Sequence, residues 1–149
     1  MRYKMLIIIA VIVLLAVYLL IPCCNACSYA VSGDGFSAEV KGDELVLRLD
    51  SNATTGYQWS VSDASDNFSC DDGTYMPDRN DKNLVGSGGI TQFHITALKT
   101  GKGTLTFQYK RSWEGGETGK VCALTLEISG RSKCLQIDKV SFKDISAGK

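Results

Sequence analysis

The chain of 149 residues has one histidine and two prolines, and the shortage of histidine limits its chemistry. The single imidazole of His94 leaves too few nitrogen and sulfur ligands to assemble a zinc site. It also lies in a run of alternating apolar and polar residues, on the polar side of a predicted strand. No nucleophile–base pair is evident around it. We therefore predict that the protein is not an enzyme and carries no metal and no other cofactor.

The chain also lacks an excess of either charge, because 16 Lys and Arg residues balance 16 Asp and Glu residues. No basic block is present, which argues against nucleic acid as a partner. Acidic residues gather between positions 63 and 81, in a polar stretch rich in Asp, Ser, Asn and Gly. We interpret this stretch as a solvated loop, because its carboxylates do not follow the spacing of a calcium-binding loop.

One long apolar run is present, at residues 5–21, and it follows a basic start. Small residues up to Ala26 come after it, which is the layout of a secretory signal. A run of this length is also at the lower limit for a helix that spans a bilayer. Residues 1–26 therefore predict a signal peptide or a membrane anchor, and lipid attached to Cys27 is a further way of anchoring. Each alternative places the rest of the chain outside the cytoplasm, secreted or anchored to the outer face of the cell membrane.

The remaining part of about 120 residues is long enough for one domain with one core. It shows period-two alternation and no window with a helical period of 3.6 residues. Strands are predicted at 37–40, 44–49, 57–61, 91–98, 103–111 and 121–129, with a weaker one within 67–75. Such strands are half-buried and antiparallel. The expected fold is all-β, an immunoglobulin-like antiparallel β-sandwich of about seven to eight strands with Trp59 in its core.

The chain is divided accordingly into the N-terminal segment 1–26, a short linker 27–35, the sandwich domain 36–129 and a C-terminal extension 130–149. The extension holds enough apolar residues to dock as an extra strand. In an exported chain disulfides are allowed, and we expect a bond from Cys70 to Cys134 to tie the extension down. Cys122 falls on an apolar strand face, which predicts a buried thiol. We expect a monomer.

Asn52–Tyr57 is the first of three segments built as stiff turns between predicted strands. The asparagine side chain can bond to nearby backbone. Thr54 and Thr55 are β-branched and restricted at χ1, and Gly56 permits a positive φ. A stiff projection of this kind loses little entropy when a partner docks on it.

The second segment, Gly86-Ser-Gly-Gly89, offers bare backbone that a partner can approach closely. Gly86, Gly88 and Gly89 leave its N–H and C=O groups unobstructed. The third segment places Arg111 and Trp113 at the start of a loop, and Trp and Arg are the residue types most enriched at interface hot spots. Three such loops without a catalytic constellation favour a protein that binds another macromolecule.

In this order, NATTGYQW (52–59), GSGG (86–89) and RSW (111–113) resemble the chagasin family of cysteine-protease inhibitors. The family pattern is Asn-Pro-Thr-Thr-Gly-Tyr/Phe-x-Trp, then Gly-x-Gly-Gly, then Arg-Pro-Trp. The resemblance covers residues 36–129. It implies an immunoglobulin-like inhibitor domain that blocks papain-type cysteine proteases reversibly and without a covalent step. The alternative is an extracytoplasmic adhesion or binding module of the same fold, because a fold alone does not fix a function.

The resemblance also implies which part of the protease each of the three loops contacts. The first enters the active-site cleft, with Thr54 and Thr55 beside the catalytic cysteine and histidine. The second lies along one wall, and the third grips the other with Trp113 as its anchor. The protease-binding residues are then Asn52, Thr54, Thr55, Gly56, Tyr57, Gly86, Gly88, Gly89, Arg111 and Trp113. Ala53 and Ser112 replace the two prolines of the pattern, which predicts looser free loops and weaker inhibition.

Overall fold

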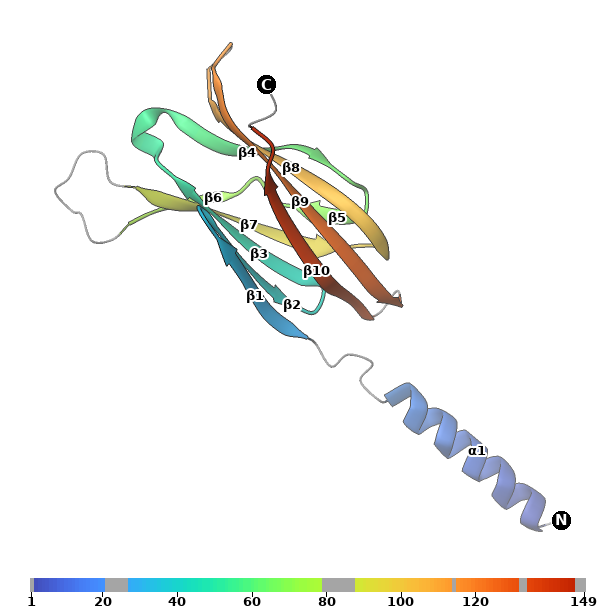
Figure 1. The fold of residues 1–149 in the computed structure, drawn as a ribbon. Coiled ribbons are helices and arrows are strands. Elements are labelled where there is room, and N and C mark those ends of the chain that lie inside the picture. Colours follow the sequence, from blue (N-terminus) through green and yellow to red (C-terminus); the bar gives the residue numbers. More distant parts are fainter. Residues whose placement is uncertain (1, 21–26, 79–87, 114, 132–133, 147–149) are drawn as a thin grey trace.

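The computed structural model describes residues 2–20, 27–78, 88–113, 115–131 and 134–146. They form one helix, ten strands and one 3-10 turn (Figure 1). The elements are α1 (Arg2–Leu20), β1 (Ser28–Gly33), β2 (Phe36–Lys41), β3 (Glu44–Ser51), η1 (Ala53–Thr55), β4 (Tyr57–Ala64), β5 (Phe68–Cys70), β6 (Thr74–Pro77), β7 (Gly89–Ala97), β8 (Gly101–Arg111), β9 (Thr118–Arg131) and β10 (Cys134–Asp144). Within the described ranges, no helix combines the length and the apolar character that a membrane crossing requires.

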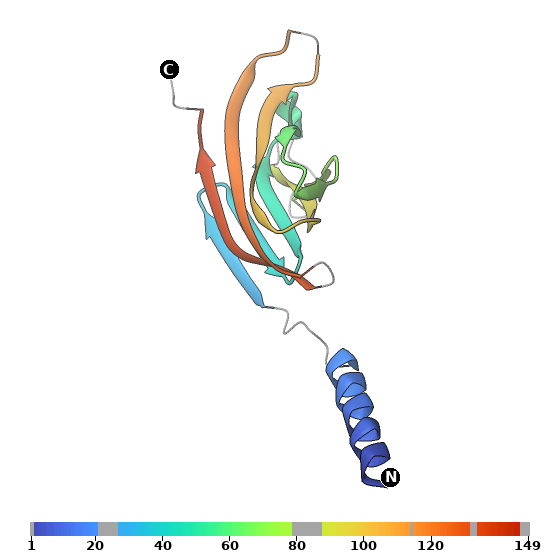
Figure 2. The ribbon, with the colours of Figure 1, turned by 90° about the vertical axis from the view of Figure 1, so that its right-hand side faces the viewer.

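The strands build two antiparallel sheets that pack face to face (Figures 1 and 2). One sheet has the order β1-β2-β3-β7-β5, with β6 also paired to β7, and the other has the order β10-β9-β8-β4. Alternate residues point into the core, as Leu45, Leu47 and Leu49 do from β3. The predicted all-β sandwich is therefore confirmed, with ten strands in place of the expected seven or eight.

Two segments differ from the expectation. The predicted linker 27–35 contains β1, which pairs with β2 along its whole length. The residues of β1 are at most partly buried, and apolar and polar residues therefore alternate only weakly in its sequence. The weak strand expected within 67–75 is in fact two short strands, β5 and the start of β6, which both pair with β7. Gly73, with φ of 79°, lies between them and turns the chain.

The C-terminal extension docks as the extra strand that its apolar residues predict. β10 pairs with β9 and contributes the fully buried Ile137 to the core. The Tyr29 hydroxyl on β1 donates to the Ile137 carbonyl at 3.2 Å. The Phe36 and Phe142 rings stack with their centroids 4.2 Å apart. These contacts join β10 to β1 and β2 and close one long side of the sandwich.

The predicted Cys70–Cys134 disulfide is wrong, because the Cys70 thiol is free. Cys70 lies in β5, at the opposite long side of the sandwich from β10. A disulfide needs the two Cα atoms within about 7 Å, and this topology keeps them apart. Burial, helped by the carboxylates of Asp71 and Asp72, raises the pKa of the Cys70 thiol to about 12, so it is protonated at neutral pH. Cys122 is buried, as predicted.

Candidate functional site

Strand register brings the candidate loops to one end of the sandwich. β3 ends at Ser51, which pairs with Gly89 at the start of β7. β4 begins at Tyr57, which pairs with Arg111 at the end of β8. Gly88 therefore lies beside the start of the first loop, and the residues that follow Arg111 lie beside its end, although they are far apart in the sequence. Ser28, where the sandwich begins, pairs with Lys41 and lies at the other end.

The first loop is a single 3-10 turn, η1, held by hydrogen bonds of its own side chains. The Asn52 side-chain oxygen accepts from the Thr54 backbone N–H at 3.1 Å and from the Thr54 hydroxyl at 2.6 Å. The Thr55 hydroxyl donates to the Asn52 carbonyl at 2.6 Å. Gly56 ends the turn in the left-handed region, with φ of 78°. The loop is thus stiff for the reasons that its sequence gives.

The first loop is also held in place by the side chain of Tyr109 in β8. Its hydroxyl accepts from the Asn52 backbone N–H at 2.9 Å and donates to the Asn52 carbonyl at 3.3 Å. One phenol group therefore satisfies both backbone groups of the residue that caps η1. Nothing in the residues of the loop points to Tyr109, which lies 57 positions from Asn52.

The third loop is held by stacking. The Arg111 guanidinium carbon lies 5.0 Å from the centre of the Tyr57 ring and 5.1 Å from that of the Trp113 ring. A cation between two aromatic faces is an attractive arrangement. Trp113 remains 53% exposed and rests against Gly56, where an added Cβ would come within 3.1 Å of its ring. The tip of the third loop therefore touches the end of the first.

The stack continues from the loops into the core. The Tyr57 and Tyr109 rings lie 5.2 Å apart, and the Tyr109 and Trp59 rings lie 4.9 Å apart. Trp59 is buried, as predicted, and its indole N–H donates to the Asp50 carbonyl at 2.9 Å. An exposed tryptophan is thus connected, ring by ring, to a core tryptophan. This aromatic ladder, from Trp59 to Trp113, connects two loops to the core through side-chain contacts.

The second loop is described only at its end, and Gly86 lies outside the described residues. The Gly88 carbonyl accepts from the Asp78 backbone N–H at 3.2 Å and from the Tyr75 hydroxyl at 3.4 Å. At Gly89 an added Cβ would lie 2.5 Å from the Met76 carbonyl, so only glycine fits there. The glycine at this position therefore also serves strand packing.

The single histidine takes the place that the sequence predicts. His94 is exposed on β7, where its ring nitrogen lies 2.9 Å from the Gln92 amide nitrogen. In the described part of the chain, no group of His, Cys, Asp and Glu side chains is arranged to hold a metal ion.

Comparison with known proteins identifies the family. The model of the chagasin family peptidase inhibitor I42 matches residues 40–128, and the chain belongs to this family. Because its members are peptidase inhibitors, family membership also confirms the expectation that the chain is not an enzyme.

Relatives with curated descriptions agree. Amoebiasin-2 of Entamoeba histolytica is 31% identical over 50% of this chain and 61% of that protein, so the chain spans about three fifths of its length. Amoebiasin-1 of the same organism is 30% identical over 59% of this chain and 84% of that protein. Chagasin of Trypanosoma cruzi is 31% identical over 55% of this chain and 78% of that protein.

A solved structure is also similar. The crystal structure of the cysteine protease inhibitor EhICP2 of Entamoeba histolytica is 29% identical and matches with a TM-score of 0.44, covering 52% of this chain and 69% of that one.

Proposed function

We propose that this protein is a reversible, non-covalent inhibitor of papain-type cysteine proteases, which docks its loops into the active-site cleft. The observation that carries this proposal is the contact between the first and third loops, where the exposed Trp113 rests on Gly56. A wedge must be rigid before it binds, because ordering a loop on binding costs affinity. The hydrogen bonds of Asn52 and the aromatic ladder supply that rigidity. Family membership favours this reading over the adhesion module.

The proposed protease-binding residues fall into two groups. Some are exposed at the loop tips, and others hold the loops in shape. Thr54 and Thr55 are exposed at the tip of the first loop, where they can reach into a cleft. The half-buried Arg111 holds Trp113, and an exposed aromatic side chain held in this way suits an interface hot spot. Asn52 and Gly56 act mainly through the shape of the loop. The docking needs no bond to form or break.

We also propose that the sandwich acts outside the cytoplasm, secreted or anchored at the outer face of the membrane. Supporting this, the apolar helix α1 precedes the sandwich and joins it near Ser28, at the end opposite the loops (Figures 1 and 2). Attachment through the N-terminus or through Cys27 would leave the inhibitory end accessible.

The test is steady-state inhibition of papain by the full-length chain, with Thr55→Ala and Trp113→Ala beside it. We expect dose-dependent inhibition that dilution reverses and that both variants weaken. Thr100→Ala and Leu98→Ala are matched controls, since both residues are exposed at the opposite end of the sandwich. Folded protein that leaves papain and a panel of cathepsin-type proteases fully active would refute the proposal.

A further inference from the structure

Two stretches of the chain match the acceptor pattern for N-linked sugars, which is an asparagine followed two positions later by serine or threonine, with no proline between them. They are Asn52-Ala-Thr54 and Asn67-Phe-Ser69. The hydroxyl of Thr54 holds the first loop, as described above. Ser69 is exposed, and its hydroxyl makes no hydrogen bond within the part of the chain that the structure describes. The fold therefore does not account for the second pattern.

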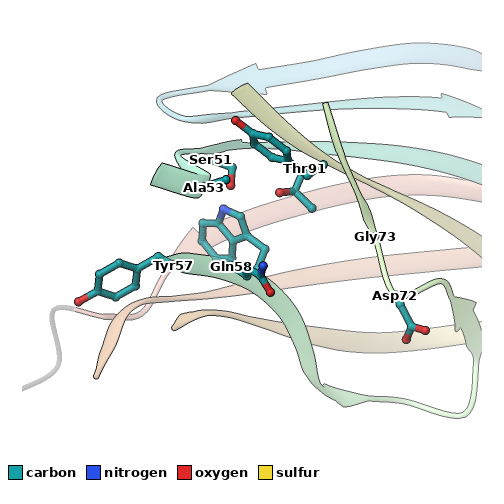
Figure 3. A pocket seen from close by; sticks show the side chains of 9 residues that line it. Ser51, Ala53, Tyr57, Gln58, Asp72, Gly73 and Thr91 are labelled. Carbon is teal, nitrogen blue, oxygen red and sulfur yellow. The ribbon is translucent and has the colours of Figure 1, made fainter. Parts of the chain in front are cut away.

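The two asparagines lie at opposite ends of the sandwich. Asn52 directly precedes Ala53, which lines a pocket beside the first loop (Figure 3). β4 starts at Tyr57, next to that loop, and runs to Ala64, so the turn that follows it and contains Asn67 is at the other end. At about 3.3 Å per residue, the strand separates the two sites by roughly 20 Å. A sugar on Asn52 would cover the end that we assign to the protease, whereas a sugar on Asn67 would leave it free.

Asn67 is held through its backbone and keeps its side chain partly exposed. Its carbonyl accepts from the Leu98 N–H at 2.7 Å and from the Lys99 N–H at 3.3 Å. Its side-chain nitrogen donates to the Thr100 carbonyl at 3.3 Å. Gly101 has φ of 121°, and a Cβ at this position would come within 3.2 Å of the Asn67 side-chain nitrogen. Because glycine has no side chain, the nitrogen stays open to approach from that side.

We propose that Asn67 is the attachment site of an N-linked oligosaccharide, which rests on the proposed location outside the cytoplasm. The donor is a lipid-linked oligosaccharide, and a membrane-bound transferase catalyses the step. The Asn67 side-chain nitrogen forms a bond to C1 of the first sugar, while the bond from C1 to the phosphate oxygen of the donor breaks. The lipid phosphate leaves with the bonding electrons, and the nitrogen gives one of its two protons to a base. The remaining N–H can still donate to the Thr100 carbonyl, so the turn keeps its structure.

The first experiment looks for the sugar directly. The full-length chain is isolated from the membranes and the medium of the cells that naturally produce it, and its chymotryptic peptides are analysed by mass spectrometry. Cleavage after Trp59 separates the two asparagines. We expect the peptide with Asn67 to gain the mass of whole sugar residues, and to gain it in Ser69→Thr as well. Ser69→Ala keeps Asn67 but removes the acceptor pattern, so the gain should be lost. Unmodified Asn67 in the natural chain, or a sugar retained in Ser69→Ala, would overturn the proposal.

The second experiment separates this inference from the proposed inhibition. The natural chain and Ser69→Ala, purified in the same way, are compared as inhibitors of papain. We expect equal inhibition constants, because Asn67 lies at the end of the sandwich that faces away from the protease. A several-fold gain in inhibition on removal of the sugar would mean that it reaches the docking loops, and would contradict this placement. A sugar on Asn52 as well, or a modified chain that leaves papain active, would count against the proposed function, while the assignment of Asn67 would stand.

Discussion

The first and third loops are both rigid, but for different physical reasons. The first is held by short hydrogen bonds among its own residues, with Asn52 at their centre. The third has two backbone bonds in its described part, from the Arg111 N–H to the Glu117 carbonyl and from the Gly116 N–H to the Trp113 carbonyl. Its Trp113 side chain is positioned by the Arg111 cation. Hydrogen bonds inside a turn act at short range and fix its backbone. Stacking fixes the position of a side chain and depends on residues supplied by another strand.

The two loops meet at Gly56, where the backbone of the first contacts the Trp113 ring of the third. This contact makes the comparison testable. Substitutions in the hydrogen-bonded loop should alter both stability and inhibition, because they release backbone groups. Substitutions at the exposed tip of the stacked loop should alter inhibition far more than stability.

The largest effect is expected for Trp113→Ala. An exposed aromatic side chain at the centre of an interface typically contributes about 2–4 kcal/mol, so the inhibition constant for papain should rise by roughly 30-fold or more. Because Trp113 is 53% exposed and stacks on Arg111, the free energy of unfolding should fall by only about 0.5–1 kcal/mol, the value of an exposed cation–π contact. Inhibition kinetics and urea unfolding measure the two quantities.

Leu98→Ala is the matched control for this substitution, since Leu98 is 52% exposed at the opposite end of the sandwich. Its inhibition constant should equal that of the unmodified chain. A loss of inhibition similar to that of Trp113→Ala would contradict the assignment of the interface to the loop end.

The next effect should come from Tyr109→Phe. The substitution keeps the ring in the aromatic ladder and removes the hydroxyl that bonds both backbone groups of Asn52. A donor left without its partner costs about 1–3 kcal/mol, which urea unfolding should detect. Inhibition should weaken as well, because η1 loses its support.

Tyr57→Phe is the control for Tyr109→Phe. It removes a hydroxyl from the same stack, but this hydroxyl donates to Glu117 at the surface. The free energy of unfolding should fall by less than about 0.5 kcal/mol. Equal losses for the two substitutions would mean that the hydroxyl of Tyr109 has no special part in holding the first loop.

The comparison also explains which parts of the structure were predictable. Strands such as β3 and β7 alternate clearly between buried and exposed residues, so their faces could be assigned from the sequence. The hydrogen bonds of the first loop connect residues two or three positions apart, and the asparagine and threonine types indicated them. β1 was missed because it is an edge strand with few buried residues.

The aromatic ladder could not be predicted in the same way. Residues 57 and 59 of β4, and 109 and 111 of β8, follow a spacing of two, which places each pair on one face of its strand. Only the register, with Trp59 opposite Tyr109 and Tyr57 opposite Arg111, turns these pairs into one stack. Register depends on how all the strands of the sheet pair, and it cannot be deduced from the residues of the two strands alone.

Gly56→Ala should have a smaller effect than Tyr109→Phe, and it acts on both loops. A side chain at φ of 78° costs about 1–2 kcal/mol, and the new methyl group would press on the Trp113 ring at 3.1 Å. Gly115→Ala is a matched control, because its φ is 73° and no other atom lies near the added Cβ. Both variants should lose similar stability, and the additional loss of inhibition by Gly56→Ala measures the contact between the loops. Equal inhibition by the two variants would show that this contact is unimportant.

The smallest effect, and the only gain, is expected for Ala53→Pro. Ala53 is the first residue of η1, a position where proline is favoured, and its backbone N–H makes no hydrogen bond within the described residues. Asn52 before it is extended, with φ of −136° and ψ of 94°, which is broadly the region that a residue preceding proline adopts. Proline should lower the entropy of the unfolded loop and add about 0.4–1 kcal/mol to the free energy of unfolding, with inhibition up to a few-fold tighter. Ala53→Gly should shift both quantities in the opposite direction. If proline instead weakens inhibition, the first loop must change its backbone on docking, and the rigidity that distinguishes it from the third loop would belong to the free protein alone.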